Sequence, residues 1–354
     1  MTIKILKGDC RDLLRTLPDE SVHCVVTSPP YFGLRDYGMA GQIGLELTPG
    51  AFVAEMVAVF RDVRRVLRAD GTLWLNLGDS YAGSGKGGNP DGGKQATNKG
   101  SQSVGCLYGT GMTAREAAVT NITRKTFDGI KAKDLIGIPW MVAFALRSDG
   151  WYLRQDIIWS KPNPMPESVR DRCTKSHEYL FMFSKSRVYS YDADAIAEDA
   201  IYSGLANQDE SGFKDPRSFN GKHKKGYRTS DKQRGHGRRH AGFNDRWDKM
   251  ERAEQCSCKR NKRSVWSVAT QGFSEAHFAT FPPALIEPCI KAGSPAGGVV
   301  LDPFGGAGTT GLVADRLGRD AILIELNTEY AAIAERRLSA DGGMFASVEI
   351  IHDE

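Results

Sequence analysis

The sequence predicts an α/β protein built on a mostly parallel sheet, and two observations support that prediction. In the first 80 residues, short apolar runs of strand character alternate with segments whose apolar residues recur every three to four positions. The same alternation returns near the end of the chain, around the stretch DPFGGAGTTG at 302–311. Strands that alternate with helices in this way form parallel sheets, because each crossover helix packs on a face of the sheet.

Local patterns assign the individual elements. Apolar residues at helical spacing between residues 51 and 67 indicate an amphipathic helix, which the Asp-Gly pair at 70–71 is expected to end. The run VHCVV at 22–26 is expected as a strand that stops before Pro29 and Pro30, since proline cannot donate to a strand ladder. The expected strands are 3–6, 22–26, 72–77, 151–159, 178–184, 298–301 and 321–325, and the expected helices are 13–17, 51–67, 135–147, 281–292 and 311–317.

Two segments interrupt this alternation. Residues 78–111 hold eleven glycines among polar residues and are expected to form a mobile loop. Residues 198–262 are polar and basic with scattered aromatic side chains, and we expect a separate small domain or a large loop there. The chain is thus predicted to consist of an N-terminal part (1–197), an insertion (198–262) and a C-terminal part (263–354), without internal repeats.

Composition excludes several classes of protein. Hydrophobic residues make up 40% and charged residues 25% of the chain, as in a globular protein with a sizeable core. No stretch approaches the roughly 18 apolar residues that cross a bilayer, and lysines interrupt the N-terminal segment where a signal peptide needs an apolar run. We therefore expect no membrane association. Seven cysteines without regular spacing argue against a disulfide framework and for a cytoplasmic protein.

Charge is distributed unevenly along the chain. The formal net charge is +4, but residues 214–240 contain ten Lys or Arg and two acids, a local charge of +8. The remainder therefore carries −4, the difference between those two values. A basic segment on a mildly acidic body indicates a protein that binds a polyanion, and a solvated loop without a partner is the alternative.

The stretch DPFGGAGTTG and the acid after the next strand have the pattern of a nucleotide site. Gly305, Gly306 and Gly308 let the backbone turn tightly and approach a ligand. Glu325 ends the following strand, where its carboxylate can accept hydrogen bonds from both ribose hydroxyls. Asp302 opens the loop and would repel a pyrophosphate, so it favours S-adenosylmethionine, which has a cationic end, over a dinucleotide. A tight turn without a ligand is the alternative.

The motifs of this chain resemble those of the amino-methyltransferases, which methylate the exocyclic amine of adenine (N6) or cytosine (N4) in DNA. The resemblance covers most of the chain, in the order of the β group of that family, where the catalytic motif precedes the cofactor motif. It rests on GDC (8–10), TSPPYF (27–32), LWLNLGDSY (73–81), IIWSKPNPMPESVRDR (157–172), HEYLFMFSK (177–185), SVWSVAT (264–270), HFATFPPALIEPCIKAG (277–293) and VLDPFGGAGTTG (300–311).

This resemblance implies a circularly permuted, Rossmann-like fold with S-adenosylmethionine as the cofactor and the insertion as a target-recognition domain for duplex DNA. Asp302 would face the methionine end of the cofactor, Glu325 the ribose, and Asp9 with Cys10 the adenine ring. The other cofactor-binding residues that it implies are Phe281, Pro282, Phe304, Gly305, Gly306, Gly308 and Thr309.

The catalytic residues that the resemblance implies are Ser28, Pro29, Pro30 and Tyr31. An exocyclic amine is a poor nucleophile because its lone pair is delocalised into the base, so catalysis needs acceptors for its N–H groups. The Ser28 hydroxyl and the Pro29 carbonyl would be that pair, and Tyr31 would stack on a base flipped out of the duplex. Ser before the prolines is more frequent in N4-cytosine members and Asp in N6-adenine members, so Ser28 favours cytosine and leaves adenine as the alternative.

Other signals are weaker. In the insertion, five basic residues are expected to contact DNA phosphates, namely Lys224, Lys225, Arg228, Arg238 and Arg239. Arg170 and Arg172 either contact the DNA backbone or only form ion pairs. No metal is expected, because zinc-site spacing is missing from the candidates Cys256, Cys258, His236 and His240.

Two rival functions stay open at this point. Related Pro-Pro-Tyr loops serve the methylation of RNA or of protein glutamine, although the long basic insertion favours a DNA duplex. A DNA-binding protein that has lost catalysis is the second rival, and the intact TSPPY and DPFGGAG motifs argue against it. A DNA methyltransferase of this kind is compatible with a homodimer and with a cognate restriction endonuclease as partner.

Overall fold

The computed structural model describes residues 1–83, 127, 129–199, 259–272, 280–342 and 347–352. The chain divides into two compact units, of which the first comprises Met1–Ala195 with Arg263–Glu354 and the second Ile196–Lys262. Within the second unit, β6 (Glu198–Asp199) pairs with β7 (Lys259–Arg260) in an antiparallel arrangement. Most of the glycine-rich segment and the basic run of the insertion lie outside the described residues.

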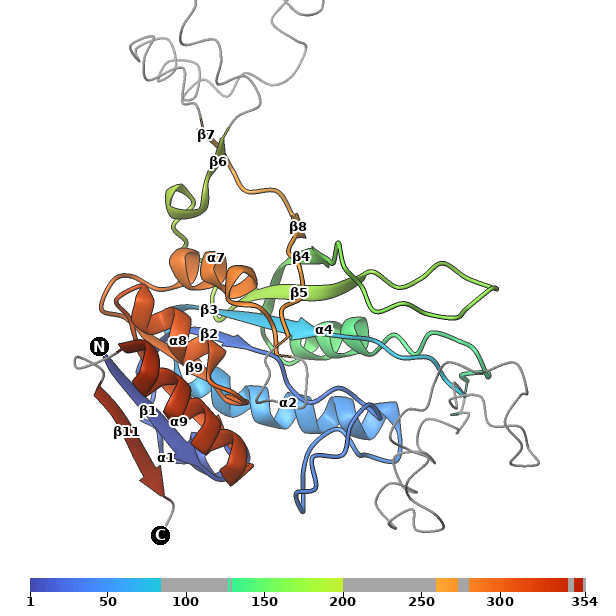
Figure 1. Cartoon of the computed structure of the whole chain (residues 1–354), viewed down its shortest axis with the longest axis horizontal. Helices are drawn as coiled ribbons and strands as arrows, with labels where there is room; N and C mark the ends of the chain where they lie inside the picture. The colour runs from blue at the N-terminus through green and yellow to red at the C-terminus, as the bar shows by residue number, and fades with distance from the viewer. Residues whose placement is uncertain (84–126, 128, 200–258, 273–279, 343–346, 353–354) are drawn as a thin grey trace, which may run out of the picture. The chain divides into compact units, whose positions relative to one another are not determined.

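The first unit contains a nine-stranded sheet with the strand order β11-β1-β10-β9-β2-β3-β5-β4-β8 (Figure 1). Its strands are β1 (Thr2–Lys7), β2 (Val22–Thr27), β3 (Leu67–Leu77), β4 (Tyr152–Ser160), β5 (His177–Ser184), β8 (Val265–Ser267), β9 (Val299–Asp302), β10 (Asp320–Glu325) and β11 (Ser347–His352). Neighbouring strands are parallel except where β5 pairs with β3 and β4. The mostly parallel sheet that the sequence predicts is confirmed. Because β9 and β10 lie between β1 and β2, the fold is also permuted as expected.

Helices pack against this sheet in two groups. The helices are α1 (Cys10–Thr16), α2 (Pro49–Val66), α4 (Ile138–Ser148), α7 (Pro283–Gly293), α8 (Thr309–Arg316) and α9 (Thr328–Gly342), with a 3₁₀ turn, η2, at Asp194–Ile196. Contacts join α1, α2 and α4 in one group and α7, α8 and α9 in the other, with the sheet between them (Figure 1). None of the described helices combines the length and the apolar character that a membrane span requires.

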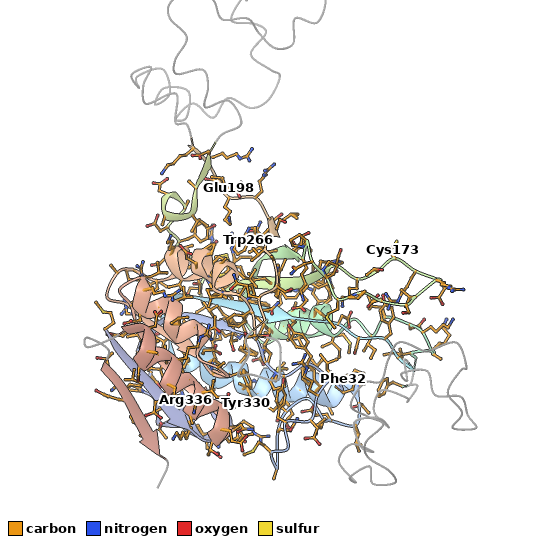
Figure 2. All side chains as sticks on the ribbon, in the orientation of Figure 1. Phe32, Cys173, Glu198, Trp266, Tyr330 and Arg336 are labelled. Atoms are coloured by element: carbon orange, nitrogen blue, oxygen red, sulfur yellow. The ribbon has the colours of Figure 1, made fainter. Side chains whose placement is uncertain are left out.

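The long helix α2 shows how the core forms. Thr48 caps its N-terminus by accepting a hydrogen bond from the Ala51 amide at 3.1 Å, and Pro49 occupies the first turn, where no amide donor is needed. Its apolar side chains are buried along one stripe, and full burial of each stabilises the fold by about 1.5–3 kcal/mol. Phe32, which Figure 2 labels, is buried in this core. Its ring centroid lies 5.7 Å from that of Phe52, so the segment after the consecutive prolines is anchored.

The structure differs from the sequence expectation in the start of one strand and in several elements that were not predicted. Strand β3 begins at Leu67, which pairs with Val22, and not at Thr72, which pairs with Cys24. Residues 68–71 therefore form an irregularity within β3, whereas the sequence predicts that the Asp-Gly pair at 70–71 lies between the helix and the strand. Helix α9 and the strands β6, β7, β8 and β11 had no predicted counterpart. The buried face of α9 consists of Ala331, Ala334 and Leu338, and small residues of this kind give a weak periodic signal.

Candidate active site

A cavity of about 300 Å³ lies at the carboxyl ends of the central parallel strands. Four chain segments at the carboxyl ends of β1, β2, β9 and β10 line it, at residues 8–11, 28–31, 302–307 and 324–327. Ligands of open α/β sheets bind in this place, because the connections on the two sides of a topological switch point diverge and leave a crevice. The permuted chain therefore brings its TSPPY stretch and its glycine loop, which are about 275 residues apart in the sequence, to one site.

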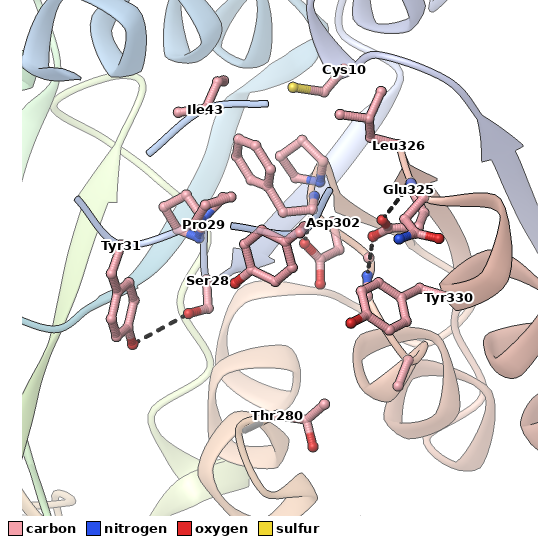
Figure 3. A pocket seen from close by; sticks show the side chains of 18 of the residues that line it. Cys10, Ser28, Pro29, Tyr31, Ile43, Thr280, Asp302, Glu325, Leu326 and Tyr330 are labelled. Carbon is pink, nitrogen blue, oxygen red and sulfur yellow. Dashed lines mark hydrogen bonds between the residues drawn. The ribbon is translucent and has the colours of Figure 1, made fainter. Parts of the chain in front are cut away.

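Glu325 organises the glycine loop (Figure 3). Its carboxylate accepts hydrogen bonds from the Gly306 amide at 2.7 Å and from the Asn327 amide at 2.8 Å. Gly306 has φ +51°, a left-handed conformation that glycine adopts without steric cost. Burial raises the pKa of Glu325 to about 7, despite the two amide donors. The carboxylate thus lies on the cavity wall with a proton affinity that a hydrogen-bonding ligand can shift.

Asp302 joins the two halves of the site. The Thr27 hydroxyl from the end of β2 and the Thr310 hydroxyl from α8 each donate to its carboxylate at 2.6 Å, and the Phe304 amide donates at 3.1 Å. Burial raises its pKa to about 6, which these hydrogen bonds partly offset. Asp302 lines the cavity, but protein groups already occupy both of its oxygens. Its effect on a ligand is therefore mainly that of a buried negative charge.

The other expected cofactor residues divide into two sets. Those that line the cavity are Asp9, Cys10, Phe281, Phe304, Gly305 and Thr309. Pro282 and Gly308 do not line it, and instead each stands before the first turn of a helix, α7 and α8 respectively. Gly308 has φ +77°, and a side chain there would meet Ala334 of α9 at 3.0 Å. Its observed role is the close packing of two helices.

Asp9 and Cys10 begin the first helix at the cavity wall. Asp9 caps α1 and accepts a hydrogen bond from the Arg11 amide at 2.9 Å. Burial alone would raise the pKa of Asp9, but its hydrogen bonds with Arg11 lower that pKa below the ordinary value. Burial raises the pKa of the Cys10 thiol to about 12, so this side chain is an uncharged apolar surface.

The opposite wall carries the TSPPY stretch and a hydrogen-bonded network (Figure 3). The Tyr31 hydroxyl lies 2.8 Å from the Glu178 carboxylate and 3.0 Å from the Asn76 amide oxygen. A hydroxyl carries one proton, and we assign it to the shorter bond with the charged acceptor. The Asn76 side-chain nitrogen donates to the Tyr179 carbonyl at 3.1 Å, so its oxygen faces Ser28, whose hydroxyl donates to it at 3.3 Å. The Ser28 hydroxyl also lies 3.4 Å from the Tyr31 hydroxyl (Figure 3), whose proton is already assigned to Glu178, so no described residue donates to the Ser28 lone pairs.

Glu178 is held from its other side by Lys161. The two form an ion pair in which the carboxylate is 17% and the ammonium 18% exposed, and the ammonium lies 4.2 Å above the Trp159 ring. Burial, together with the Glu178 charge, raises the pKa of Tyr31 well above its ordinary value, so the phenol stays protonated. Gly78 packs against the ring, since a Cβ there would lie 2.4 Å from Tyr31 Cε2. The ring is thus fixed at its edge and at its hydroxyl.

Among the described residues, no backbone donor occupies the carbonyl of Pro29. The consecutive prolines supply no N–H of their own, and β2 ends at Thr27, one residue before Ser28. The expected pair of acceptors, the Ser28 hydroxyl and the Pro29 carbonyl, therefore belongs to a cavity-lining segment, and both groups have lone pairs to which no described residue donates.

The structure also brings residues to the cavity that sequence reasoning missed, which are Tyr37, Asn76, Lys161, Glu178 and Tyr330. The rings of Tyr37 and Tyr330 meet edge to face, with centroids 6.4 Å apart. Asn76 had a visible signal, because it is the polar residue in the otherwise apolar strand segment LWLNL. Arg172, which the sequence left between two roles, pairs with Glu167 at 2.7 Å.

Some expectations fall on residues that the structure does not describe. These are the five basic residues assigned to DNA phosphates, Lys224, Lys225, Arg228, Arg238 and Arg239, and the rejected zinc candidates Cys256, Cys258, His236 and His240. They stay predictions. Among the described residues, no cluster of three or more His, Cys, Asp or Glu side chains could hold a metal ion.

Strands in this order around such a cavity define the Rossmann-like fold of S-adenosylmethionine-dependent methyltransferases. The N6_N4_Mtase family of DNA methylases matches residues 22–336, and the chain belongs to this family. It is therefore a DNA methyltransferase.

Named relatives agree with this assignment. The type II methyltransferase M.XycI of Xanthomonas campestris pv. cyanopsidis is 43% identical over 94% of this chain and 87% of its own length. The type II methyltransferase M.SmaI of Serratia marcescens is 43% identical over 95% of this chain and 90% of its own length.

Two solved structures share the fold. A DNA modification methylase from Thermus thermophilus, complexed with S-adenosyl-L-methionine, matches with a TM-score of 0.53 and 23% identity over 99% of each chain. The PvuII DNA methyltransferase, named as cytosine-N4-specific, matches with a TM-score of 0.54 and 18% identity over 95% of this chain and 87% of its own.

Proposed function

We propose that this DNA methyltransferase moves a methyl group from S-adenosylmethionine to the N4 amine of a cytosine flipped out of duplex DNA. One observation carries the proposal. The glycine loop with its buried acids and the TSPPY stretch with its free acceptors line the same cavity from opposite sides. A nucleoside-containing methyl donor and a flipped base can therefore meet there.

The residues of the cavity fit this methyl donor. Glu325 at the end of β10 is placed to accept hydrogen bonds from ribose hydroxyls, and the buried charge of Asp302 favours a cationic group. Cys10 gives apolar surface for an adenine ring, while Phe281 is placed to help hold the methionine moiety and Phe304 to shape the pocket. When bound, S-adenosylmethionine supplies an electrophilic methyl group.

The chain's own residues prepare the target amine. The Ser28 hydroxyl donates to Asn76, which directs its lone pairs towards one N–H of the amine, while the Pro29 carbonyl accepts from the other. Holding both N–H groups directs the nitrogen lone pair towards the methyl donor. No strong base is needed, because the nitrogen becomes acidic only after alkylation.

Tyr31 supplies a stacking surface for the flipped base, a contact worth about 1–3 kcal/mol in single-strand binding sites. Glu178 and Gly78 hold this ring in place before the base arrives. Preorganisation of this kind lowers the entropy that the transition state has to lose.

Ser28 supports cytosine as the target. A neutral hydroxyl stands before the prolines here, where the N6-adenine members that the sequence resembles more often carry Asp. The residues 198–262 are proposed to recognise the DNA sequence, and their basic side chains to contact phosphates. The type II names of the relatives support a cognate restriction endonuclease that cuts the same sequence.

Expression of the chain in a host without DNA methylation tests the proposal. Host DNA is digested to nucleosides and the modified base is identified by mass spectrometry. We expect N4-methylcytosine, and a Ser28→Ala variant should leave the DNA unmodified. N6-methyladenine alone would overturn the choice of cytosine, and unmodified DNA together with no binding of S-adenosylmethionine would overturn the enzyme itself.

A further inference from the structure

The connection between β4 and β5, residues 161–176, emerges at the edge of the sheet where the cavity lies. Strand β5 is antiparallel to β3, and β4 is antiparallel to β5, so β4 ends at the same edge as β2 and β3. Lys161, the first residue of the connection, lines the cavity. Asn163 exchanges hydrogen bonds of 2.9 and 3.2 Å with Thr270, which also lines the cavity. The connection therefore starts at the cavity rim.

Hydrogen bonds and ion pairs hold this connection in shape. Glu167 accepts from Arg172 at 2.7 Å and from the Lys175 amide at 3.3 Å, which closes the segment between them. The Arg172 guanidinium lies 4.1 Å from the centre of the Tyr81 ring, and the Lys175 ammonium donates to the Asp79 carbonyl at 2.9 Å. The connection is thus tied at both ends, and it projects away from the sheet, as the place of Cys173 shows in Figure 2.

Met165 lies on this connection and is exposed to an unusual degree. Its exposed fraction of 85% is the highest among the exposed large apolar residues that the structure describes. Pro164 and Pro166 flank it, and both fix a backbone angle, so the chain has little freedom to fold the side chain back. Burying a methionine side chain stabilises a protein by about 1.5–3 kcal/mol, and this fold leaves that gain unused on a connection whose first residue lines the cavity.

The charges of the connection suit a polyanion. The connection contains more basic than acidic residues: the bases are Lys161, Arg170, Arg172 and Lys175, and the acids are Glu167 and Asp171. An apolar tip on a segment of net positive charge is compatible with a base stack bordered by phosphates. A protein partner would instead require a wider apolar patch around the tip.

We propose that Met165 is a wedge that enters the base stack of the duplex at the position vacated by the flipped target base. The inference rests on the proposed function, since only a base-flipping enzyme leaves such a gap. Extruding a base costs a few kcal/mol in lost stacking and pairing, and apolar side chains, Met among them, are inserted between base steps in other DNA complexes. An unbranched, polarizable side chain adapts well to an irregular gap.

The test compares two duplexes that carry the sequence methylated in host DNA. In one the target base is paired normally, and in the other it lies opposite an abasic site, where extrusion needs little help. We expect Met165→Ala to lower kcat/KM on the paired duplex by about 10- to 100-fold, as a loss of a few kcal/mol implies. The loss on the abasic duplex should stay below about threefold, and Met165→Leu should retain most activity on both.

Val188→Ala is the matched control. Val188 is 81% exposed and follows the end of β5, at the opposite edge of the sheet from the cavity. This control should match the wild type on both duplexes, and Met165→Ala should keep wild-type affinity for S-adenosylmethionine, which reports an intact fold. Equal losses on the two duplexes, or no loss on either, would overturn the wedge. If the wild type methylated neither duplex, the proposed function itself would be overturned.

Discussion

Replacing Tyr31 by Phe should slow methyl transfer while leaving DNA and cofactor binding nearly unchanged. The substitution keeps the ring, and hence the stacking surface, but removes the hydroxyl that lies 2.8 Å from the Glu178 carboxylate. A hydrogen bond to a charged group contributes about 1.5–3 kcal/mol. If that energy holds the ring in its reactive orientation, kcat should fall by about 10- to 100-fold, since 1.36 kcal/mol corresponds to a factor of ten.

A double-mutant cycle with Glu178→Gln tests whether this loss comes from the pair. Single-turnover transfer of a tritiated methyl group to duplex DNA measures each variant, and calorimetry measures its affinity for S-adenosylmethionine. In the Glu178→Gln background, Tyr31→Phe should cost about tenfold less than in the wild type, because its charged acceptor is already lost. Independent, multiplying effects would refute the reasoning.

Tyr152→Phe is the matched control for the loss of a hydroxyl. Tyr152 is 45% exposed and begins β4, at the opposite edge of the sheet from the cavity. Its replacement should leave the rate at the wild-type value. A Tyr31→Phe variant with the full rate would show that the hydroxyl network is only structural.

Three further predictions concern the cavity. Glu325 has a pKa raised to about 7 and must lose its proton to accept from ribose hydroxyls, so affinity for S-adenosylmethionine should rise as pH increases to about 7 and then level off. Glu325→Gln should flatten this pH profile of the affinity, measured by calorimetry, and a flat profile for the wild type would contradict the prediction. Gly78→Ala places a Cβ 2.4 Å from the Tyr31 ring and should abolish methyl transfer with cofactor binding retained, so an active variant would refute the packing argument. Thr27→Val removes one donor from Asp302 and should lower the free energy of unfolding in urea by about 1–3 kcal/mol. The loss should be larger at pH 8 than at pH 5, because the pKa of Asp302 is about 6 and the bond is stronger to the ionised carboxylate, and an unchanged urea midpoint would exclude the role of this bond.

Periodicity in the sequence was enough to predict most elements of the fold. The apolar stripe of α2 and the apolar runs of β2 and β9 are local patterns that span only a few residues. Such patterns predict a helix or a strand without information about the rest of the chain. The prediction was weakest where apolar patterning is faint, as in α9, whose buried face is largely alanine. It also misplaced the start of β3, because pairing of Leu67 with Val22 overrode the local turn signal.

The sequence by itself determined the two motifs of the site and the family, because residue types such as the consecutive prolines, the glycines and Glu325 carry their chemistry locally. Only the tertiary structure decided what surrounds Tyr31. Glu178 reaches it because β5 inserts antiparallel beside β3, in a register that sets Asn76 opposite Leu180. Register depends on the packing of the whole sheet, and no short stretch of sequence encodes it.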